Sequence, residues 1–198
     1  ESQKNRCIVV CEDLGTVPHN FREYLAASGV LSYRVLYFER TDNGAFMEPD
    51  RYPSQALATV STHDLPTLAG YWLGRDLDEK AHLELFSSRD SEQAAREDRR
   101  LDRERLCEFL KQYGELPDQK RLDELDYDAL VAAIIKILAK TPCLLVSLQI
   151  EDLLGIEEQA NMPGTIDQHP NWRRKLPEKT GQIFTRPVFD CLRELIET

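Results

Sequence analysis

Residues 7–15 read CIVVCEDLG, an apolar run that passes directly into two acids, a leucine and a glycine. Residues 8–10 have the continuous apolar character of a parallel strand that is buried on both faces. The pattern recurs in LATVSTHD at 57–64, where a β-branched run ends on His63 and Asp64. In proteins with parallel strands, functional groups gather where the strands reach their carboxyl ends. These two strand ends therefore predict both the fold class and the candidate site.

Four apolar segments of the chain predict a sheet. They lie at residues 8–10, 33–39, 56–62 and 142–150. A helical pattern follows the first of them, with apolar residues at i, i+3 and i+4 and with Thr16 placed to cap the helix. Strands that alternate with helices indicate βα units and parallel pairing. The predicted class is α/β.

The middle of the chain differs in composition from the two ends. Residues 89–105 carry dense alternating charge, which predicts a helix face turned toward water. A stronger apolar stripe follows, with Asp126 placed to cap its helix. The predicted organisation is βα units at 1–74, a helical insertion at 75–140, and a last strand, a loop and a closing helix at 141–198.

Composition disfavours several classes of partner. The formal net charge of −10 argues against nucleic acid, because neutralising phosphates requires clustered Lys and Arg. It also argues against an anionic membrane surface, and no segment reaches transmembrane length. The five cysteines are odd in number and form no CxxC pair, which predicts free thiols in a reducing compartment. A cytoplasmic location and a neutral ligand such as a polysaccharide are expected.

The strand-end acids are candidates for chemistry. A lone acid after a strand is more often a helix cap or an ion-pair partner, but here Glu12 and Asp64 end two strands, and His63 adjoins the second. Retaining glycoside transfer needs one carboxylic acid and one carboxylate about 5 Å apart. A divalent-metal site is the alternative, since one His and two carboxylates can form a facial triad. The residues alone leave both alternatives open.

Six blocks of the sequence, in this order, resemble the C-terminal portion of amylomaltase, the 4-α-glucanotransferase family of the α-amylase superfamily. They are IVVCEDLGTVP at 8–18, SYRVLYFE at 32–39, YP at 52–53, STHDLPTLAGYW at 61–72, NMPGT at 161–165 and NWRRKL at 171–176. The resemblance covers nearly the whole chain. It implies the C-terminal half of a (β/α)8 TIM barrel, carrying strands five to eight, with a helical insertion before the last strand. The N-terminal half of the same barrel is then the missing partner.

The resemblance also implies a role for each candidate residue. Glu12 matches the general acid/base, and Asp64 matches the carboxylate that stabilises the transition state. Four residues match positions that bind the glucan: His63, Phe38, Asp42 and Asn161. Asp13 is expected to be a structural partner at the strand end. The family's nucleophile is an aspartate on strand four, which would precede residue 1, so this sequence by itself is expected to be inactive.

The implied activity is transfer of α-1,4-glucan segments between maltodextrins, with no metal and no cofactor. Three alternatives stay open on the sequence. The first is a glucan hydrolase or debranching enzyme of the same superfamily. The second is a divalent-metal TIM-barrel enzyme that uses Glu12, His63 and Asp64, and the third is a glucan-binding remnant without catalysis.

Overall fold

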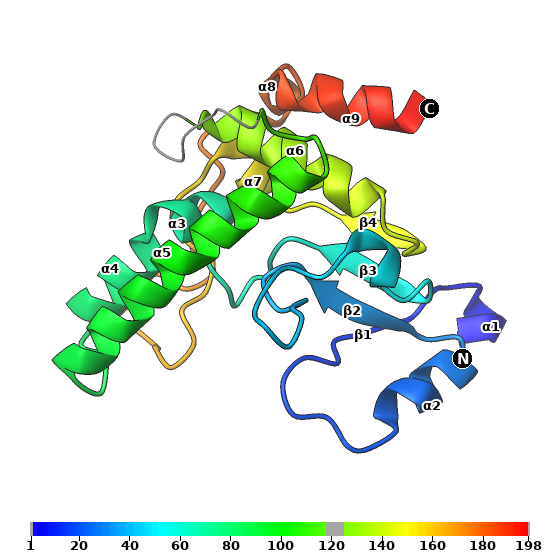
Figure 1. Ribbon diagram of the computed structural model, residues 1–198, viewed down its shortest axis with the longest axis horizontal. Helices are drawn as coiled ribbons and strands as arrows, with labels where there is room; N and C mark the ends of the chain where they lie inside the picture. Colours follow the sequence, from blue (N-terminus) through cyan, green and yellow to red (C-terminus); the bar gives the residue numbers. More distant parts are fainter. Residues whose placement is uncertain (1, 118–124, 198) are drawn as a thin grey trace. The chain divides into compact units, whose positions relative to one another are not determined.

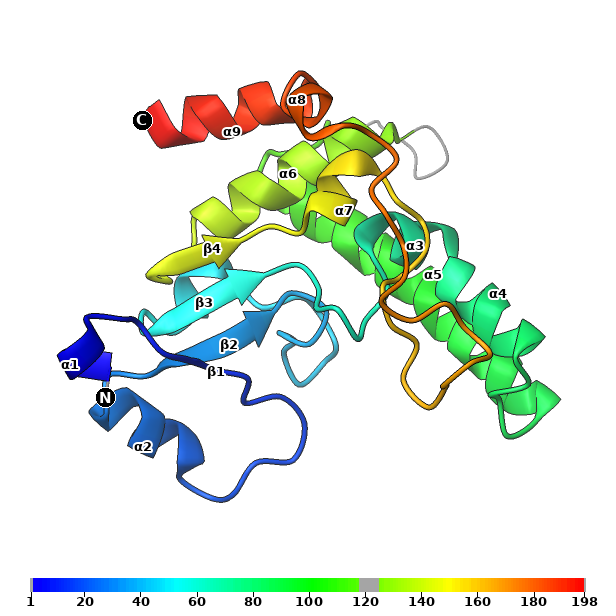
Figure 2. The same cartoon turned by 180° about the vertical axis from the view of Figure 1, so that it is seen from behind.

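The computed structural model describes residues 2–117 and 125–197 (Figures 1 and 2). Its parallel strands and helices form an α/β structure, which confirms the predicted class. The contacts divide the chain into two units. The first unit takes in residues 1–60 and 138–147, and the second takes in residues 61–137 and 148–198.

Within the described residues, the first unit contains a four-stranded sheet in the order β1-β2-β3-β4. The strands are β1 (Val10–Cys11), β2 (Leu31–Val35), β3 (Ala56–Thr59) and β4 (Leu145–Ser147). Every neighbouring pair is parallel, and Thr59 pairs with Val35 on one side and Ser147 on the other. Helix α1 (Ser2–Asn5) precedes β1, a 3-10 helix (Pro49–Arg51) precedes β3, and helix α2 (Phe21–Ala27) joins β1 to β2. The parallel pairing predicted from the sequence is confirmed.

Three predicted strand ends are wrong: that of β3, which stops at Thr59 and not at residue 62, and those of β2 and β4. β2 stops at Val35, before residue 39, because the amides of Phe38 and Glu39 turn back to the Val35 carbonyl at 2.9 and 3.2 Å. The last strand stops at Ser147, and helix α7 (Ile150–Leu154) begins where the sequence predicted more strand. For β2 and β4, a local turn replaces the sheet hydrogen bonds.

Burial of the first strand on both faces is also a wrong prediction. The strand begins at Val10, and the side chains of Ile8 and Val9 are 68% and 40% exposed. On the other edge of the sheet, Leu144 and Val146 are 65% and 41% exposed. β1 and β4 each have one neighbouring strand in the described part of the chain, so these apolar residues lack cover.

Helix α2 starts later than predicted. Thr16 does not cap it, because the helix begins at Phe21, directly after Asn20 in the left-handed conformation. The helix ends before Gly29, whose φ of 68° is the left-handed stop that glycine provides.

The second unit is built from helices in its described part. They are α3 (Leu68–Leu73), α4 (Arg75–His82), α5 (Arg89–Gln112), α6 (Tyr127–Ala139, which ends in the first unit), α7, α8 (Thr180–Ile183) and α9 (Val188–Glu197). The Asp126 carboxylate accepts from the amide of Ala129 at 3.3 Å, which confirms the predicted cap of α6. Residues 118–124 of the predicted insertion lie outside the described residues.

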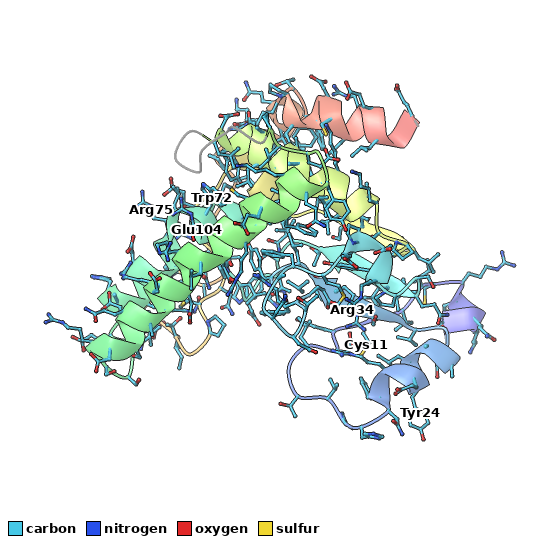
Figure 3. All side chains as sticks on the ribbon, in the orientation of Figure 1. Cys11, Tyr24, Arg34, Trp72, Arg75 and Glu104 are labelled. Atoms are coloured by element: carbon cyan, nitrogen blue, oxygen red, sulfur yellow. The ribbon has the colours of Figure 1, made fainter. Side chains whose placement is uncertain are left out.

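Two arginines of the charged helix α5 contact side chains of neighbouring helices. The prediction that the charged residues of this helix face water is therefore wrong for these two. Arg99 donates to both carboxylate oxygens of buried Asp76 at 2.7 and 2.9 Å. Its guanidinium carbon lies 3.8 Å from the centre of the Tyr71 ring. Arg103 lies over the ring of Trp72, which is labelled on α3 in Figure 3. Paired and stacked guanidinium groups therefore bind α5 to α3 and α4.

The first turn of α3 is docked on residues 152–157. The Thr67 hydroxyl accepts from the Gly70 amide at 3.0 Å and donates to the Ile156 carbonyl at 2.5 Å. A Cβ atom at Gly70 would lie 2.3 Å from the carbonyl oxygen of Glu157. Because that oxygen belongs to the backbone, only glycine fits this position without movement of the main chain.

We expect Gly70→Ala to lower the free energy of unfolding by about 1–3 kcal/mol, because the added methyl group overpacks the contact with Glu157. Alanine is the better helix former by about 1 kcal/mol, so helix propensity predicts the opposite sign. Chemical denaturation measures the difference. Gly181→Ala in α8 is the matched control, because nothing lies within 4 Å of its Cβ position. Equal stability of Gly70→Ala and the unmodified protein would contradict the close approach.

Candidate functional site

His63 and Asp64 lie in a short loop, residues 61–67, which precedes α3. The hydroxyl of buried Ser61 donates to the carbonyl of Pro66 at 2.7 Å, and this hydrogen bond spans the loop. The side chains of His63 and Asp64 remain 49% and 46% exposed. The bond between Ser61 and Pro66 therefore fixes the loop backbone, while the side chains of His63 and Asp64 stay accessible.

The Asp64 carboxylate contacts two other predicted site residues, Asn161 and His63. Its Oδ1 accepts a hydrogen bond from Nδ2 of Asn161 at 2.6 Å. Its Oδ2 lies 3.6 Å from Nε2 of His63. The structure thus brings His63, Asp64 and Asn161 together, although Asn161 is 97 residues beyond Asp64 in the chain.

Asn161 belongs to a closed loop, residues 159–172. The amide of Trp172 donates to the carbonyl of Ala160 at 3.0 Å and closes the loop at its base. The side-chain amide of Gln159 donates to the backbone carbonyl of Asn161 at 2.5 Å. These bonds fix the backbone that presents the Asn161 amide to Asp64.

Trp172 is a site residue that the sequence analysis missed. Its ring centre lies 5.2 Å from that of His63, with the two planes at 45°. Its side chain is 64% exposed, and its φ of 60° is uncommon for a residue other than glycine. Backbone strain of this kind gathers at functional sites. The available signal was a single large aromatic residue in the polar NWRRKL segment.

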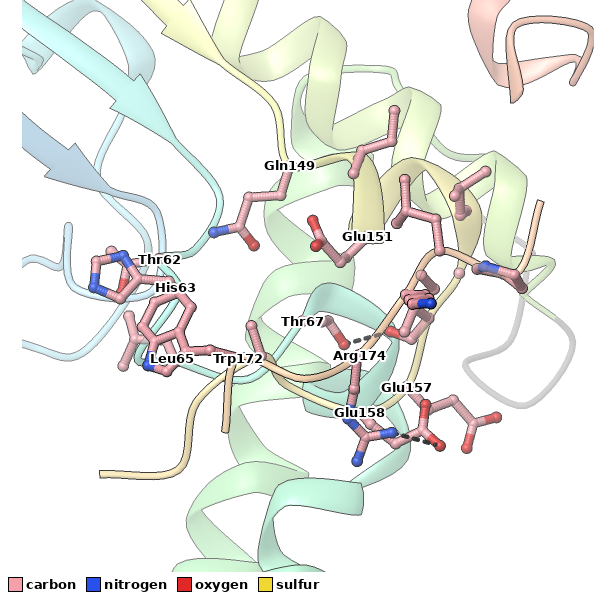
Figure 4. Close-up of a pocket in the computed structure, with 18 residues that line it drawn as sticks. Thr62, His63, Leu65, Thr67, Gln149, Glu151, Glu157, Glu158, Trp172 and Arg174 are labelled. Carbon is pink, nitrogen blue, oxygen red and sulfur yellow. Dashed lines mark hydrogen bonds and ion pairs between the residues drawn. The ribbon is translucent and has the colours of Figure 1, made fainter. Parts of the chain in front are cut away.

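A pocket of about 700 Å³ is lined by His63 and Trp172 at one side (Figure 4). Its volume is typical of small-molecule sites, which measure about 300–1,000 Å³. Gln149 and Glu151 contribute to its lining, and so does Arg174, which pairs with Glu158 at 3.3 Å. All the lining residues belong to the second unit.

Asp152 is a buried acid beside the pocket-lining Glu151. Its Oδ1 accepts from the amide of Leu68 at 2.7 Å, and no described residue bonds to its Oδ2. Burial raises the pKa of this carboxyl from 3.8 to about 7, against the opposing effect of the Leu68 amide and with a further contribution from the charge of Glu151. The group that anchors the first turn of α3 therefore titrates near neutral pH.

Three predicted site residues, Glu12, Phe38 and Asp42, belong to the first unit. Glu12 is exposed. The pKa of Tyr33 is raised mainly by its own burial, and the charge of Glu12 adds to this rise. Phe38 is 52% exposed in the turn that follows β2, and Asp42 is exposed in the next loop. Convergence of these residues with His63 and Asp64 on one ligand stays a prediction.

Asp13 has the structural role that was expected of it. The residue is buried, and its carboxylate accepts from the amide of Tyr33 at 2.7 Å and from Nε of Arg22 at 2.9 Å. These bonds tie the segment after β1 to β2 and to helix α2. Both carboxylate oxygens of Asp13 are therefore bonded within the protein.

Across residues 2–117 and 125–197, the structure has no helix with the length and apolar character needed to cross a membrane. Over the same ranges, no three His, Cys, Asp or Glu side chains are grouped in a way that could hold a metal ion.

The fold and the site together define a class: α/β proteins that arrange a carboxylate, an imidazole and an amide beside a pocket of small-molecule size. The family model described as 4-alpha-glucanotransferase matches residues 1–180. The chain belongs to the 4-alpha-glucanotransferase family.

Individual relatives agree with this assignment. A 4-alpha-glucanotransferase of Haemophilus influenzae is 36% identical over 188 residues, which are 93% of this chain and 27% of that protein. A 4-alpha-glucanotransferase of Mycobacterium bovis is 34% identical over 186 residues, which are 92% of this chain and 25% of that protein. The crystal structure of amylomaltase from Corynebacterium glutamicum matches with a TM-score of 0.81 and 26% identity, over 96% of this chain and 28% of that one.

The chain therefore spans about a quarter of the length of these relatives. The resemblance to the C-terminal portion of amylomaltase is confirmed.

We expect Asp152 to make stability depend on pH between about 4 and 7. Its folded-state pKa of about 7 lies above the ordinary value of 3.8, so in this window the folded protein holds a proton that the unfolded chain releases. The stability that this proton contributes is present at low pH and is lost as the pH rises toward 7. Asparagine carries no such proton. When the pH rises from 5 to 8, the unfolding free energy of Asp152→Asn should therefore increase by about 2–3 kcal/mol relative to that of the unmodified protein.

Denaturation curves recorded across this pH range measure the effect. Asp50→Asn is the control, because Asp50 is exposed on the 3-10 helix and its replacement should leave the pH dependence unchanged. If the Asp152→Asn and unmodified proteins follow parallel stability–pH curves, Asp152 does not carry this proton.

Proposed function

We propose that the protein containing this chain is a 4-α-glucanotransferase, which transfers α-1,4-glucan segments between maltodextrins by a retaining mechanism. The observation that carries the proposal is the Asp64 carboxylate held between Asn161 and His63 in a chain of this family. The relatives from Haemophilus influenzae and Mycobacterium bovis bear the same name. α-1,4-Glucans are then the ligand of the site.

We propose further that the sheet is the C-terminal half of a (β/α)8 barrel, strands five to eight, with 75–140 inserted between 1–74 and 141–198. The parallel order of β1 to β4 supports this, and so do the exposed apolar side chains at both sheet edges. Further parallel strands beside Ile8 and Leu144 would cover these side chains and close the ring. The N-terminal half of the barrel is the partner that would supply those strands.

The first half of the proposed reaction breaks the glycosidic bond. Glu12, in its protonated form, gives its proton to the leaving 4-oxygen of the glucan. At the same time an aspartate from the N-terminal half attacks C1 from the opposite face. The C1–O4 bond breaks, the shortened glucan leaves with a 4-hydroxyl, and a β-linked glucosyl–enzyme forms.

The second half restores the α linkage. Glu12, now ionised, takes the proton from the 4-hydroxyl of an acceptor glucan as that oxygen attacks C1. The aspartate departs as a carboxylate, and two inversions give net retention. If water attacks in place of the acceptor, the outcome is hydrolysis, which is the nearest alternative activity.

Asp64 acts on the transition state in this scheme. Its carboxylate would accept hydrogen bonds from the sugar hydroxyls near C1, and these strengthen as positive charge develops on the ring. Interactions that are stronger in the transition state than in the ground state raise the rate. Asn161 would hold the carboxylate in the orientation that makes those bonds, and His63 would donate to the same sugar.

We expect Glu12→Gln, introduced in the full-length protein, to lower the rate of maltotriose disproportionation by a factor of about 10²–10⁴, because glutamine cannot transfer a proton. Glucose and longer maltodextrins released from maltotriose measure the reaction. Glu23→Gln makes the same chemical change at an exposed position of α2 and should leave the rate unchanged. Full activity of Glu12→Gln would remove Glu12 from the mechanism.

The same assay separates the alternatives. Transfer conserves the number of reducing ends, so we expect that number to stay constant while glucose and longer chains accumulate. A steady rise in reducing ends would identify a hydrolase or debranching enzyme. Loss of activity after chelation of divalent cations would favour the metal-dependent alternative.

A further inference from the structure

His169 is a buried histidine of the loop 159–172, which lies beside α4 (Figures 1 and 2). Its side chain is 2% exposed, and the proposed reaction does not use it. Nδ1 of the ring lies 3.2 Å from Oε1 of Glu79 on α4, and Nε2 lies 3.3 Å from the backbone carbonyl oxygen of Gln159. The ring therefore lies between helix α4 and the base of the loop that carries Asn161.

The two oxygens that contact the ring of His169 determine which protonation state fits. A carboxylate and a carbonyl oxygen are both acceptors, whereas a neutral imidazole has a single N–H. A neutral ring would set the lone pair of one nitrogen against an oxygen at 3.2 or 3.3 Å. The imidazolium donates from both nitrogens, and its charge is paired with Glu79, as a buried charge requires. The geometry therefore favours the charged form of the ring.

A second pocket, lined by α4 and by residues 157–174, contains the other charges near this pair. His82 is one of its lining residues and is exposed on α4. The charged side chains that line the pocket beside Glu79 each have a partner of opposite charge: Asp76 with Arg99, Asp78 with Arg96, Arg75 with Glu157, and Arg174 with Glu158. Glu79 is therefore the carboxylate that pairs with His169.

We propose that His169 is a positioning residue, which holds Asn161 in place and thereby orients the Asp64 carboxylate. The inference rests on the proposed function and adds a residue to its site. The ring of His169 fixes the backbone carbonyl of Gln159, and the Gln159 side chain donates to the Asn161 carbonyl at 2.5 Å. The side-chain amide of Asn161 donates to Oδ1 of Asp64 at 2.6 Å. A continuous chain of contacts therefore joins α4 to the carboxylate of the site.

The expected effect on the reaction follows from the role of Asp64. Its bonds to the sugar are strongest in the transition state, so misplacing this carboxylate lowers kcat more than it weakens substrate binding. Displacement of a catalytic group by about 1 Å can lower the rate by a factor of about 10². A residue that acts through Asn161 should therefore change kcat and leave KM nearly constant.

The test introduces His169→Gln in the full-length protein and measures maltotriose disproportionation. We expect kcat to fall by a factor of about 10–10², while KM changes by less than about threefold. Glu79→Gln keeps the shape of the side chain and removes the charge that pairs with the imidazolium, so it should also lower kcat. His82→Gln is the matched control, because it makes the same chemical change at an exposed residue of the same pocket and should leave kcat unchanged.

A double-mutant cycle tests whether His169 acts through Asn161. Adding His169→Gln to Asn161→Ala should lower kcat further by less than about twofold, because residues that act as one unit have non-additive effects. Fully additive losses would overturn the inference, and so would full activity of His169→Gln. Thermal unfolding checks that each variant is folded. Glu79→Gln, at a half-buried position of α4, serves in the same cycle if His169→Gln does not fold.

Crystal structures separate a failure of this inference from a failure of the proposed function. In full-length His169→Gln or Glu79→Gln, Nδ2 of Asn161 should lie beyond hydrogen-bond distance of Oδ1 of Asp64, compared with 2.6 Å in the unmodified chain. An unchanged hydrogen bond in both variants would overturn the inference whatever their activity. Absence of disproportionation by the unmodified protein would instead overturn the proposed function.

Discussion

The first turn of helix α3 is held against residues 152–157, and the candidate site in the second unit depends on that contact. The Leu68 amide donates to Asp152, the Thr67 hydroxyl bonds to Ile156, and the bare Cα of Gly70 lets the Glu157 carbonyl approach. The two hydrogen bonds satisfy polar atoms of the helix end and of the opposing backbone, and the glycine leaves room for the close approach. Without them, buried main-chain donors and acceptors would lack partners, at about 1–3 kcal/mol each.

This contact fixes one end of each of the two loops that carry Asp64 and Asn161, the residues of the hydrogen bond at the site. The loop that carries Asp64 ends where α3 begins, so the start of the helix determines where the loop must finish. The loop that carries Asn161 begins directly after the segment on which α3 is docked. Two segments that are far apart in the sequence therefore meet because each is attached to one side of the same junction.

The sequence predicts those features that short-range patterns determine. Apolar runs that alternate with helical patterns predict the strands and their parallel pairing, and a capping acid at Asp126 predicts the start of α6. Features that depend on distant partners are missed. The pairing of Arg99 with Asp76 joins two different helices, and the exposure of Ile8 depends on which strand lies beside it.

In the candidate site, too, some residues were predicted from the sequence and one was not. His63 and Asp64 are predicted from the strand end, Asn161 is predicted from the resemblance, and the three are found in contact, whereas Trp172 was missed. Nothing in the local sequence marks Trp172 as a neighbour of His63, because its position results from the closure of its loop on Ala160. Long-range backbone bonds of this kind leave no periodic signal in the sequence.

Three acids near strand ends show why the pattern alone cannot identify a catalytic carboxylate. Asp13 is buried and bonded by an amide and a guanidinium, so its charge serves the fold. Asp152 is buried with one oxygen unbonded in the described structure, so burial raises its pKa to about 7 and favours its neutral form. Asp64 is half exposed and is held by a side-chain amide beside an imidazole. Of the three, only the carboxylate of Asp64 is both oriented by the protein and accessible to a ligand's hydroxyl groups, and this combination is what stabilisation of a sugar transition state requires.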